Sequence, residues 1–156
     1  MYATAVRWMI RRNVQKVNNG DIGPMLSGYA DDATLVFPGK HSWGGEYRGK
    51  ERIRAFLQRC VDSNIKFDVE EIAVDGWPWN TSICVRLSDE AKAPDGRVVY
   101  ANRAMIFAKI RWGKITFQED YEDTQRVVMF DQYLESSEGK QATNDREAVA
   151  AGAKEQ

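Results

Sequence analysis

The chain has 156 residues, of which 43% are hydrophobic and 29% charged, as in an ordinary globular domain with a single core. Its 22 basic and 23 acidic residues leave a formal net charge of −1, which argues against a protein that binds nucleic acid through a basic face. With two cysteines and one histidine, the sequence predicts no disulfide framework, no metal site and no cofactor.

The first segment has the apolar spacing of an amphipathic helix, with Val6, Ile10 and Val14 on one face and basic residues elsewhere around the axis. The basic residues are spread through the segment, unlike the charged start and apolar run of a signal peptide. No stretch approaches the roughly 18 uncharged apolar residues that span a bilayer. We therefore expect a cytoplasmic protein that has no membrane partner.

Turn-forming residues separate this helix from the segments that follow. Asn18-Asn19-Gly20 ends the helix, and a short second helix follows, with Tyr29 facing inward. Asp31-Asp32 is expected to break that second helix. Residues 34–37 then have the character of a strand, which Pro38-Gly39 stops.

A glycine-rich loop over residues 40–49 comes next and carries His41 and Trp43. It leads into the clearest helix of the sequence. The apolar residues of this helix follow an i, i+3, i+4, i+7, i+8 spacing: Ile53, Phe56, Leu57, Cys60 and Val61. This spacing predicts one wide apolar stripe that packs against a flat surface.

The second half of the chain has the pattern of strands. Four segments are rich in β-branched and aromatic residues and are separated by turn signals: 67–75, 81–88, 98–110 and 114–121. Short turns between consecutive strands predict an antiparallel meander. Helices followed by a sheet predict an α+β domain.

A last helix is predicted over residues 125–134, with Asp123 or Thr124 as its cap. Residues 135–156 are rich in Ala, Glu, Lys, Ser and Gly and contain few large apolar side chains, so we expect a mobile tail. The sequence thus predicts one domain over residues 1–134, followed by that tail.

Three groups of residues together resemble the SnoaL-like family, within the wider nuclear-transport-factor-two-like superfamily. Their order, spacing and element types agree with the family from about residue 6 to residue 134. The groups are Gly20-Asp21-Ile22 with Tyr29-Ala30-Asp31-Asp32-Ala33-Thr34, Phe37-Pro38-Gly39 with 43–50, and Asn102 with Gly113-Lys114-Ile115 and 120–124.

The resemblance implies a cone-shaped, mainly antiparallel mixed sheet that wraps around the N-terminal helices, as in cystatin-like α+β barrels. It also implies an apolar cavity where a small molecule binds, and a homodimer formed through the outer face of the sheet. Members of the family include enzymes that act on polyketides, steroids or terpene epoxides, and other members bind without catalysis. The fold alone therefore does not decide the function.

The residues that ketosteroid isomerases use are missing from the matching positions. The catalytic base falls on Phe37, the oxyanion tyrosine on Asn13, and the protonated acid near Ala104 or Met105. None of these groups can perform the corresponding step. The sequence therefore argues against steroid isomerisation by that mechanism.

Epoxide hydrolases of this shape need an Arg and an Asp two residues apart, together with a second Asp. Asp120 matches the second acid, but the pair reads Arg103-Ala104-Met105 and lacks the water-activating carboxylate. A SnoaL-like polyketide cyclase needs only one acid/base near a pocket. Asp120 is the candidate for that role.

Strand alternation puts Gln118 on the same face as Asp120 and puts Phe117, Glu119 and Tyr121 on the other face. The resemblance directs the Gln118 and Asp120 face into the cone, where burial would raise the pKa of the carboxyl. The alternative is that Asp120 has a structural role and bonds Asn102 or Arg86 to fill a polar gap in the core.

Other residues are candidates for binding or catalysis, each with a structural alternative. His41 is a candidate acid, base or carbonyl donor at the rim of the cavity, or an exposed loop residue. Asn102 could orient a ligand carbonyl or bond a neighbouring backbone group. Arg86 could pair with Asp120, hold an acidic ligand group or point outward.

Aromatic side chains are the expected wall of the cavity. Trp43 and Trp79 could line it or serve as packing residues, and large aromatics favour packing wherever they sit. The remaining candidates for ligand contact are Phe37, Phe56 and Tyr29.

Two functional hypotheses follow from these residues. The first is a cofactor-free cyclase, isomerase or lyase that performs acid–base chemistry on a small apolar oxygenated molecule such as a polyketide or terpenoid. The second is a module of the same fold that binds a small ligand or dimerises without catalysis.

Overall fold

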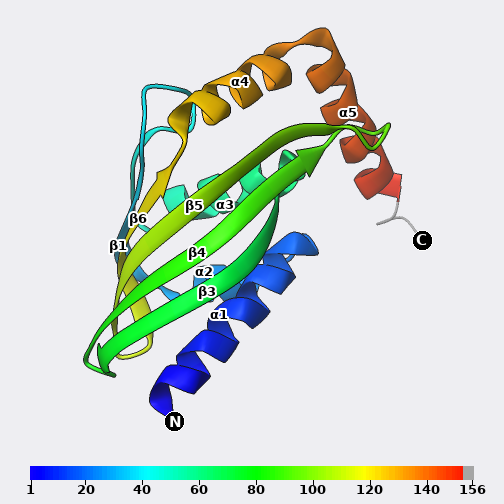
Figure 1. The fold of residues 1–156 in the computed structure, drawn as a ribbon. Coiled ribbons are helices and arrows are strands. Elements are labelled where there is room, and N and C mark those ends of the chain that lie inside the picture. The colour runs from blue at the N-terminus through cyan, green and yellow to red at the C-terminus, as the bar shows by residue number, and fades with distance from the viewer. Residues whose placement is uncertain (153–156) are drawn as a thin grey trace.

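The computed structural model describes residues 1–152, which form an α+β domain built on one curved sheet (Figure 1). Within these residues the helices are α1 (Tyr2–Asn18), α2 (Gly23–Ser27), α3 (Lys50–Asp62), α4 (Thr124–Glu135) and α5 (Ser137–Gly152). The strands are β1 (Tyr29–Phe37), β2 (Gly45–Arg48), β3 (Lys66–Trp77), β4 (Asn80–Lys92), β5 (Val98–Arg111) and β6 (Lys114–Glu122).

The six strands form one sheet in the order β2-β1-β6-β5-β4-β3. Strands β3 to β6 pair as the predicted antiparallel meander, and β1 runs parallel to β6, so the sheet is mixed. β2 and β3 remain as open edges, and the sheet does not close into a barrel. The predicted α+β class and curved mixed sheet are confirmed, in an open form of the cystatin-like architecture.

The β3–β4 hairpin depends on a glycine near the end of β3, just before the turn at residues 78–79. Gly76 has a φ of 103°, and a Cβ atom at this position would lie 2.3 Å from the carbonyl oxygen of Asn80. Only glycine accepts both the backbone angle and the close approach. The turn predicted from this residue is therefore fixed by steric exclusion.

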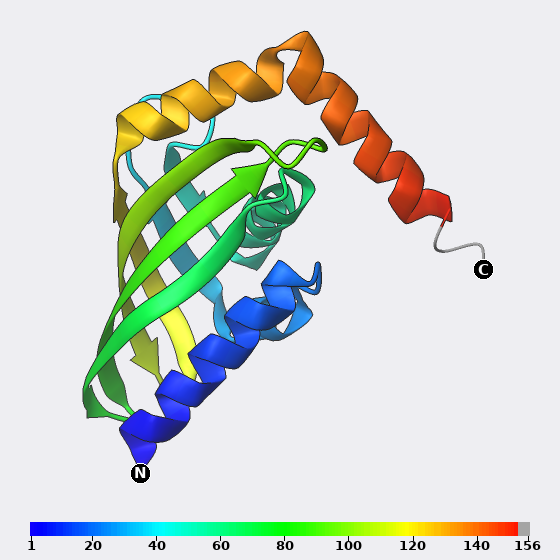
Figure 2. The same cartoon turned by 45° about the vertical axis from the view of Figure 1, so that its right-hand side comes forward.

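Helix α1 lies along the β3 edge of the sheet, as Figures 1 and 2 both show. The Asn18 side chain donates to the carbonyl oxygen of Phe67 at 2.8 Å and accepts from its N–H at 2.9 Å, much as a neighbouring strand would. Arg7 and Arg11 donate to the carbonyl oxygens of Ile72 and Val69. These polar side chains form hydrogen bonds with backbone groups that an edge strand otherwise leaves unpaired.

Helix α3 lies within the curve of the sheet (Figure 2) and buries the predicted apolar stripe. Ile53, Phe56, Leu57 and Cys60 are all buried, whereas Val61 is half-buried. Helix α4 crosses the wide end of the sheet (Figure 2), and Asp123 caps it by accepting from the Gln125 N–H at 3.0 Å.

Strand pairing changes two of the predicted boundaries. β1 begins at Tyr29, so Asp31 and Asp32 are exposed strand residues and not the end of a helix. Residues 45–48, expected in a loop, pair with β1 as strand β2. Both segments are strands because β1 has partners on both sides, which local composition does not reveal.

The segment predicted to be a mobile tail is helical up to Gly152, and residues 153–156 lie outside the described residues. Ala142 is buried, and Arg146 donates to the carbonyl oxygens of Asp62 and Lys92, at 3.3 Å in each case. A composition rich in Ala, Glu and Lys predicted disorder, but these residues also have high helix propensity. The mobility of this segment stays a prediction, but its helical structure was not foreseen.

In the part of the chain that the structure describes, no helix combines the length and the apolar character needed to cross a bilayer.

Candidate functional site

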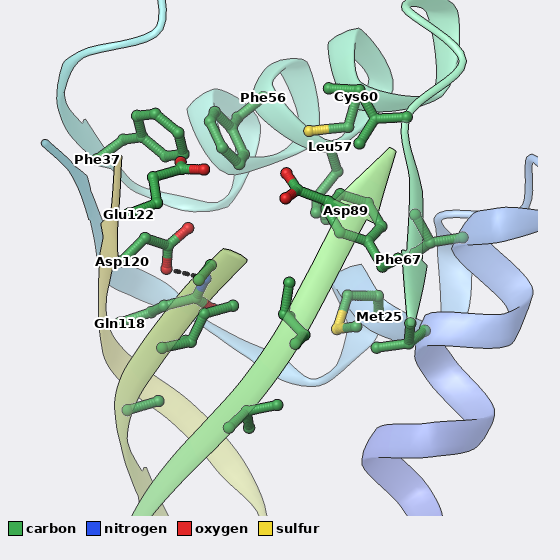
Figure 3. Close-up of a pocket in the computed structure, with 18 of the residues that line it drawn as sticks. Met25, Phe37, Phe56, Leu57, Cys60, Phe67, Asp89, Gln118, Asp120 and Glu122 are labelled. Atoms are coloured by element: carbon green, nitrogen blue, oxygen red, sulfur yellow. Dashed lines mark hydrogen bonds between the residues drawn. The ribbon is translucent and has the colours of Figure 1, made fainter. Parts of the chain in front are cut away.

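A cavity of about 130 Å³ lies between the concave face of the sheet and the helices (Figure 3). Its wall is mainly apolar and includes residues of α1, α3 and α4 as well as β3 to β6. Four residues that line it carry amide or carboxyl side chains: Asp89, Gln118, Asp120 and Glu122. An apolar cavity with a few convergent polar groups has the general character of a small-molecule site.

Strand β6 supplies three of these polar side chains. Gln118, Asp120 and Glu122 alternate along the strand and all face the cavity, while Tyr121 is 54% exposed on the opposite face. The period-two geometry of a strand explains this separation. Gln118 and Asp120 therefore share the inward face that the alternation predicts.

A chain of hydrogen bonds holds the Asp120 carboxylate in place. The Tyr29 hydroxyl donates to Gln118 Oε1 at 2.5 Å, and Gln118 Nε2 donates to Asp120 Oδ1 at 2.8 Å. Because the hydroxyl fixes the amide oxygen, the amide nitrogen must point at Asp120. Among the described residues, no donor reaches Asp120 Oδ2. One carboxylate oxygen is thus anchored and the other is open to a ligand.

Burial changes the protonation of Asp120. Removal from water raises the pKa of this carboxyl to about 7, against the opposing effect of the hydrogen bond from Gln118. The negative charges of Asp89 and Glu119 are smaller causes of the same rise. Near neutral pH the group is therefore present in both its acid and its base form.

Two further carboxylates face the same cavity and were missed by the sequence analysis. Burial raises the pKa of Asp89, on β4, to about 6, and burial followed by the charge of Asp89 raises the pKa of Glu122 to about 8. Asp89 follows Val85 and Leu87 on the inward face of β4, so its alternation with buried residues was a usable signal. The predicted strand stopped at residue 88, one position before Asp89, whereas β4 continues to Lys92.

The predicted aromatic wall is present in part. Tyr29, Phe37, Trp43 and Phe56 all line the cavity. The Phe37 and Phe56 ring centroids are 5.4 Å apart, and those of Trp43 and Phe56 are 6.2 Å apart. Arg59 lies over the Trp43 ring at 3.8 Å, which helps to hold the glycine-rich loop against α3.

Asn102 is buried behind the cavity wall and does not bond Asp120. Its Nδ2 atom lies 3.0 Å from both Glu122 Oε2 and the carbonyl oxygen of Asp123, and its Oδ1 accepts from the Arg103 N–H at 2.9 Å. These contacts fit the structural alternative, in which the amide bonds its surroundings. Its indirect role is to orient Glu122.

His41 lies in the loop before β2 and does not line the cavity. The backbone N–H of Trp43 donates to its Nδ1 at 3.3 Å, and its ring meets the Phe37 ring at an edge-on angle, with centroids 5.8 Å apart. Its Nε2 is buried and has no partner among the described residues. The histidine therefore supports the cavity wall at Phe37 and is not beside Asp120.

Two of the predicted ligand contacts lie outside the cavity. Arg86 points to the outer face of β4, where it pairs with Glu70 at 3.0 Å and Glu71 at 3.8 Å and not with Asp120. Trp79 is 53% exposed in the β3–β4 hairpin and stacks on Trp77 with centroids 5.7 Å apart. Of the alternatives given for Arg86, the outward one is observed, and it agrees with strand alternation because the neighbours Val85 and Leu87 face inward.

Within residues 1–152, no group of three or more His, Cys, Asp or Glu side chains is arranged so that it could hold a metal ion.

The chain also matches a known protein family. The SnoaL-like domain family matches residues 10–118. This chain belongs to the SnoaL-like family. No curated protein sequence shows significant similarity to it.

Solved structures of this SnoaL-like protein's relatives share its fold at low sequence identity. An NTF2-like protein of unknown function from Burkholderia pseudomallei has a TM-score of 0.66 and 17% identity, covering 80% of this chain and 95% of its own. TerC co-crystallized with polyporic acid has a TM-score of 0.63 and 23% identity, and the match covers 78% of this chain and 95% of TerC. SalBIII, an epoxide hydrolase/cyclase-like enzyme in pyran ring formation of salinomycin, has a TM-score of 0.65 and 18% identity, and the match covers 80% of this chain and 95% of SalBIII.

Proposed function

We propose that this SnoaL-like protein is a cofactor-independent enzyme of the cyclase, isomerase or lyase type, with Asp120 as its acid/base. Its substrate would be a small, largely apolar, oxygenated molecule. The observation that carries the proposal is the geometry of Asp120, which is buried at an apolar cavity with Oδ1 held by Gln118 and Oδ2 free of protein donors among the described residues.

The electrostatics of the cavity support this role. A general acid/base works best when its pKa lies near the operating pH, and burial raises the pKa of Asp120 to about 7. The pKa of Glu122 is raised to about 8, so at pH 7 this group is mostly protonated and can donate a hydrogen bond to a developing oxyanion. Asp120 would then remove a proton while Glu122 stabilises the resulting negative charge.

The relatives support the same chemistry without establishing it for this chain. SalBIII is described as an epoxide hydrolase/cyclase-like enzyme, and TerC was crystallised with polyporic acid, which is an oxygenated ligand. Ring closure and isomerisation both require proton transfer at carbon or oxygen. One positioned carboxyl group in an apolar cavity can provide that transfer.

The test follows proton transfer directly. Wild-type protein and Asp120→Asn are incubated in deuterated water with a panel of small apolar ketones, hydroxyquinones and epoxides, and NMR records turnover and deuterium uptake next to the carbonyl. We expect the variant to lose roughly 10²-fold or more of the wild-type rate while ligand binding is kept. Asp32→Asn, which changes an exposed carboxylate of β1, is the control.

The outcome also separates the two functional classes. If wild type binds panel members but neither transforms them nor exchanges their hydrogens, the protein is a binding module and the enzyme proposal is wrong. Equal rates for wild type and Asp120→Asn would also contradict the role of Asp120.

A further inference from the structure

The charged side chains that line the cavity all have the same sign. Among the residues of the described chain that form its wall, the acids are Asp89, Asp120 and Glu122, and there is no Lys, Arg or His. Asp89 lies on β4, whereas Asp120 and Glu122 lie on β6, so the acids face one another from two strands (Figure 3). Arg59, which lies over Trp43, is engaged by Asp131 at 3.6 Å.

Burial raises the pKa of the Asp89 carboxyl against the opposing effect of hydrogen bonding from the Tyr100 hydroxyl and from its own backbone, yet one of its oxygens is an unused acceptor inside this cavity. The residue is 7% exposed, and its Oδ1 atom is buried with no hydrogen-bond partner among the described residues. Figure 3 shows its carboxyl directed into the cavity from the side opposite Asp120. A buried acceptor without a donor is costly, and it is relieved by a ligand that brings an N–H or O–H group.

Mutual repulsion of the acids narrows the choice of ligand. The negative charge of Asp89 raises the pKa of both Asp120 and Glu122, so the three groups are close enough to disfavour one another's ionised forms. A cation placed among them would reverse this effect, because opposite charges at short range favour the ionised forms. An anionic ligand would meet the carboxylates in a medium of low polarity and be rejected.

We propose that the cavity binds a small apolar amine as its ammonium ion, with the nitrogen at the unpartnered Oδ1 of Asp89 and the rest of the molecule directed toward Asp120 and Glu122 on the opposite wall. An ammonium brings both N–H donors and a positive charge to this buried acceptor. Aromatic rings in the same wall, including Phe56 and Tyr100, offer further stabilisation of a cation. This inference deepens the proposed function, on which it rests for the use of the cavity, because it names the class of substrate.

Bound ammonium also has a consequence for the chemistry. By offsetting the charge of Asp89 it would favour the carboxylate form of Asp120, which is the form that removes a proton, while Glu122, whose pKa is raised chiefly by burial, keeps its proton. An oxygenated amine would thus bring both the activating charge and the group to be deprotonated. Protons displaced from the carboxyls pass to the solvent when the cation enters.

The experiment compares three probes that differ only in their polar group: 2-phenylethylamine, 2-phenylethanol and phenylacetate. Calorimetric titrations at pH 7.5 in phosphate and in Tris give affinity and proton release. We expect the amine to bind at least about tenfold more tightly than the alcohol, and phenylacetate not to bind. The heat measured for amine binding should differ between the two buffers, because the released protons are taken up by buffers that have different ionisation enthalpies.

Variants test which carboxylates are used. Asp89→Asn keeps the size of the side chain. It should weaken amine binding roughly tenfold or more, while the affinity for the alcohol should change by less than about threefold. Glu71→Gln is the matched control, because this carboxylate lies outside the cavity and is 71% exposed beside Arg86. Thermal melting of each variant verifies that the fold is kept.

The result separates this inference from the proposed function. Alcohol binding as tight as amine binding, or an amine affinity unchanged by Asp89→Asn, overturns the amine assignment. The proposed function stands in that case if neutral ketones still exchange hydrogens in an Asp120-dependent manner. Selective amine binding without turnover or hydrogen exchange of any ligand upholds the amine assignment and overturns the enzyme proposal. Failure of all three probes to bind overturns the amine assignment.

Discussion

The Tyr29–Gln118–Asp120 chain makes a buried phenol part of the positioning of a carboxylate. Tyr29 is 2% exposed, and its hydroxyl is the group that fixes the Gln118 amide. Without it, the amide oxygen has no donor among the residues that the structure describes, and the amide can rotate away from Asp120. The orientation of the reactive carboxyl thus depends on a residue two hydrogen bonds away.

Tyr29→Phe should therefore cost about 1–3 kcal/mol of unfolding free energy, because a buried amide oxygen loses its donor while the ring packing is kept. Urea denaturation measures the change. Tyr121→Phe, at an exposed tyrosine of the same sheet, should change the unfolding free energy by less than about 0.5 kcal/mol. Equal effects of the two substitutions would show that the Tyr29 hydroxyl is not part of a buried network.

The three cavity acids also predict how stability depends on pH. Their ordinary pKa values are 3.8 for Asp and 4.5 for Glu, and in the folded protein they are raised to about 6, 7 and 8 for Asp89, Asp120 and Glu122. The folded state therefore keeps protons that the unfolded chain has released. It follows that stability falls as pH rises from about 4 to about 8, by about 1.4 kcal/mol per pH unit for each fully linked proton.

Urea denaturation of wild type and Asp120→Asn between pH 5 and pH 8.5 checks this dependence. The wild-type unfolding free energy should decrease with pH across this window, and the variant should show a shallower decrease. A wild-type stability that rises with pH, or an identical slope in the variant, would contradict the raised pKa of Asp120.

At the residue scale, alternation predicted the site only where strand boundaries were known. Gln118 and Asp120 lie well inside a predicted strand, so their inward face could be assigned from sequence. Glu122 was grouped with the start of the last helix, although it continues the same face. Asp89 pairs with Asn102 across β4 and β5, and this long-range pairing extends β4 beyond its apolar segment. Such pairing joins residues far apart in the sequence, so it could not be predicted from local composition.

At the scale of the elements, the edge of β3 is protected by side chains of α1. The sequence predicted Asn18 as a helix-ending residue, which it is, but its amide also pairs with both backbone groups of Phe67. This second role depends on where β3 lies in space. Periodicity predicted α1, α3 and the meander, because their apolar spacing is local. It did not predict β2, which is a strand only through its pairing with β1.

Asn18→Ala should destabilise the protein by about 1–3 kcal/mol, because two hydrogen bonds to the β3 edge are lost at once. Asn19→Ala is the control, since the neighbouring amide is exposed. Hydrogen exchange of the Phe67 amide gives a local readout, and only the Asn18 variant should accelerate it. Equal destabilisation by both variants would contradict the role of Asn18 at the strand edge.

At the scale of the whole molecule, one face of the sheet encloses the cavity and the other faces outward. Met105 and Tyr121 are opposite each other on β5 and β6, and they are 43% and 54% exposed. We propose that this outer face forms the homodimer expected from the family resemblance. Cavity and dimer contact would then use opposite sides of the same strands.

Tyr121→Glu should shift the protein toward monomer, because it would place a charge beside Met105 in the proposed contact, and analytical ultracentrifugation measures the mass. Arg12→Glu, on the exposed side of α1, is the control and should leave the mass unchanged. A wild-type protein that is monomeric at micromolar concentration, or a Tyr121→Glu variant that stays dimeric, would contradict this assignment of the outer face.

The central claim is that Asp120 is a carboxyl group that titrates near neutral pH inside a cavity open to a ligand. The most direct measurement is the carboxyl carbon chemical shift of Asp120, followed by NMR against pH in aspartate-labelled protein and assigned by its absence from Asp120→Asn. We predict a titration midpoint of about 7, as burial of the carboxyl requires. A midpoint near 4 would mean that Asp120 is a permanently ionised structural acid, and it would contradict the proposed acid–base role.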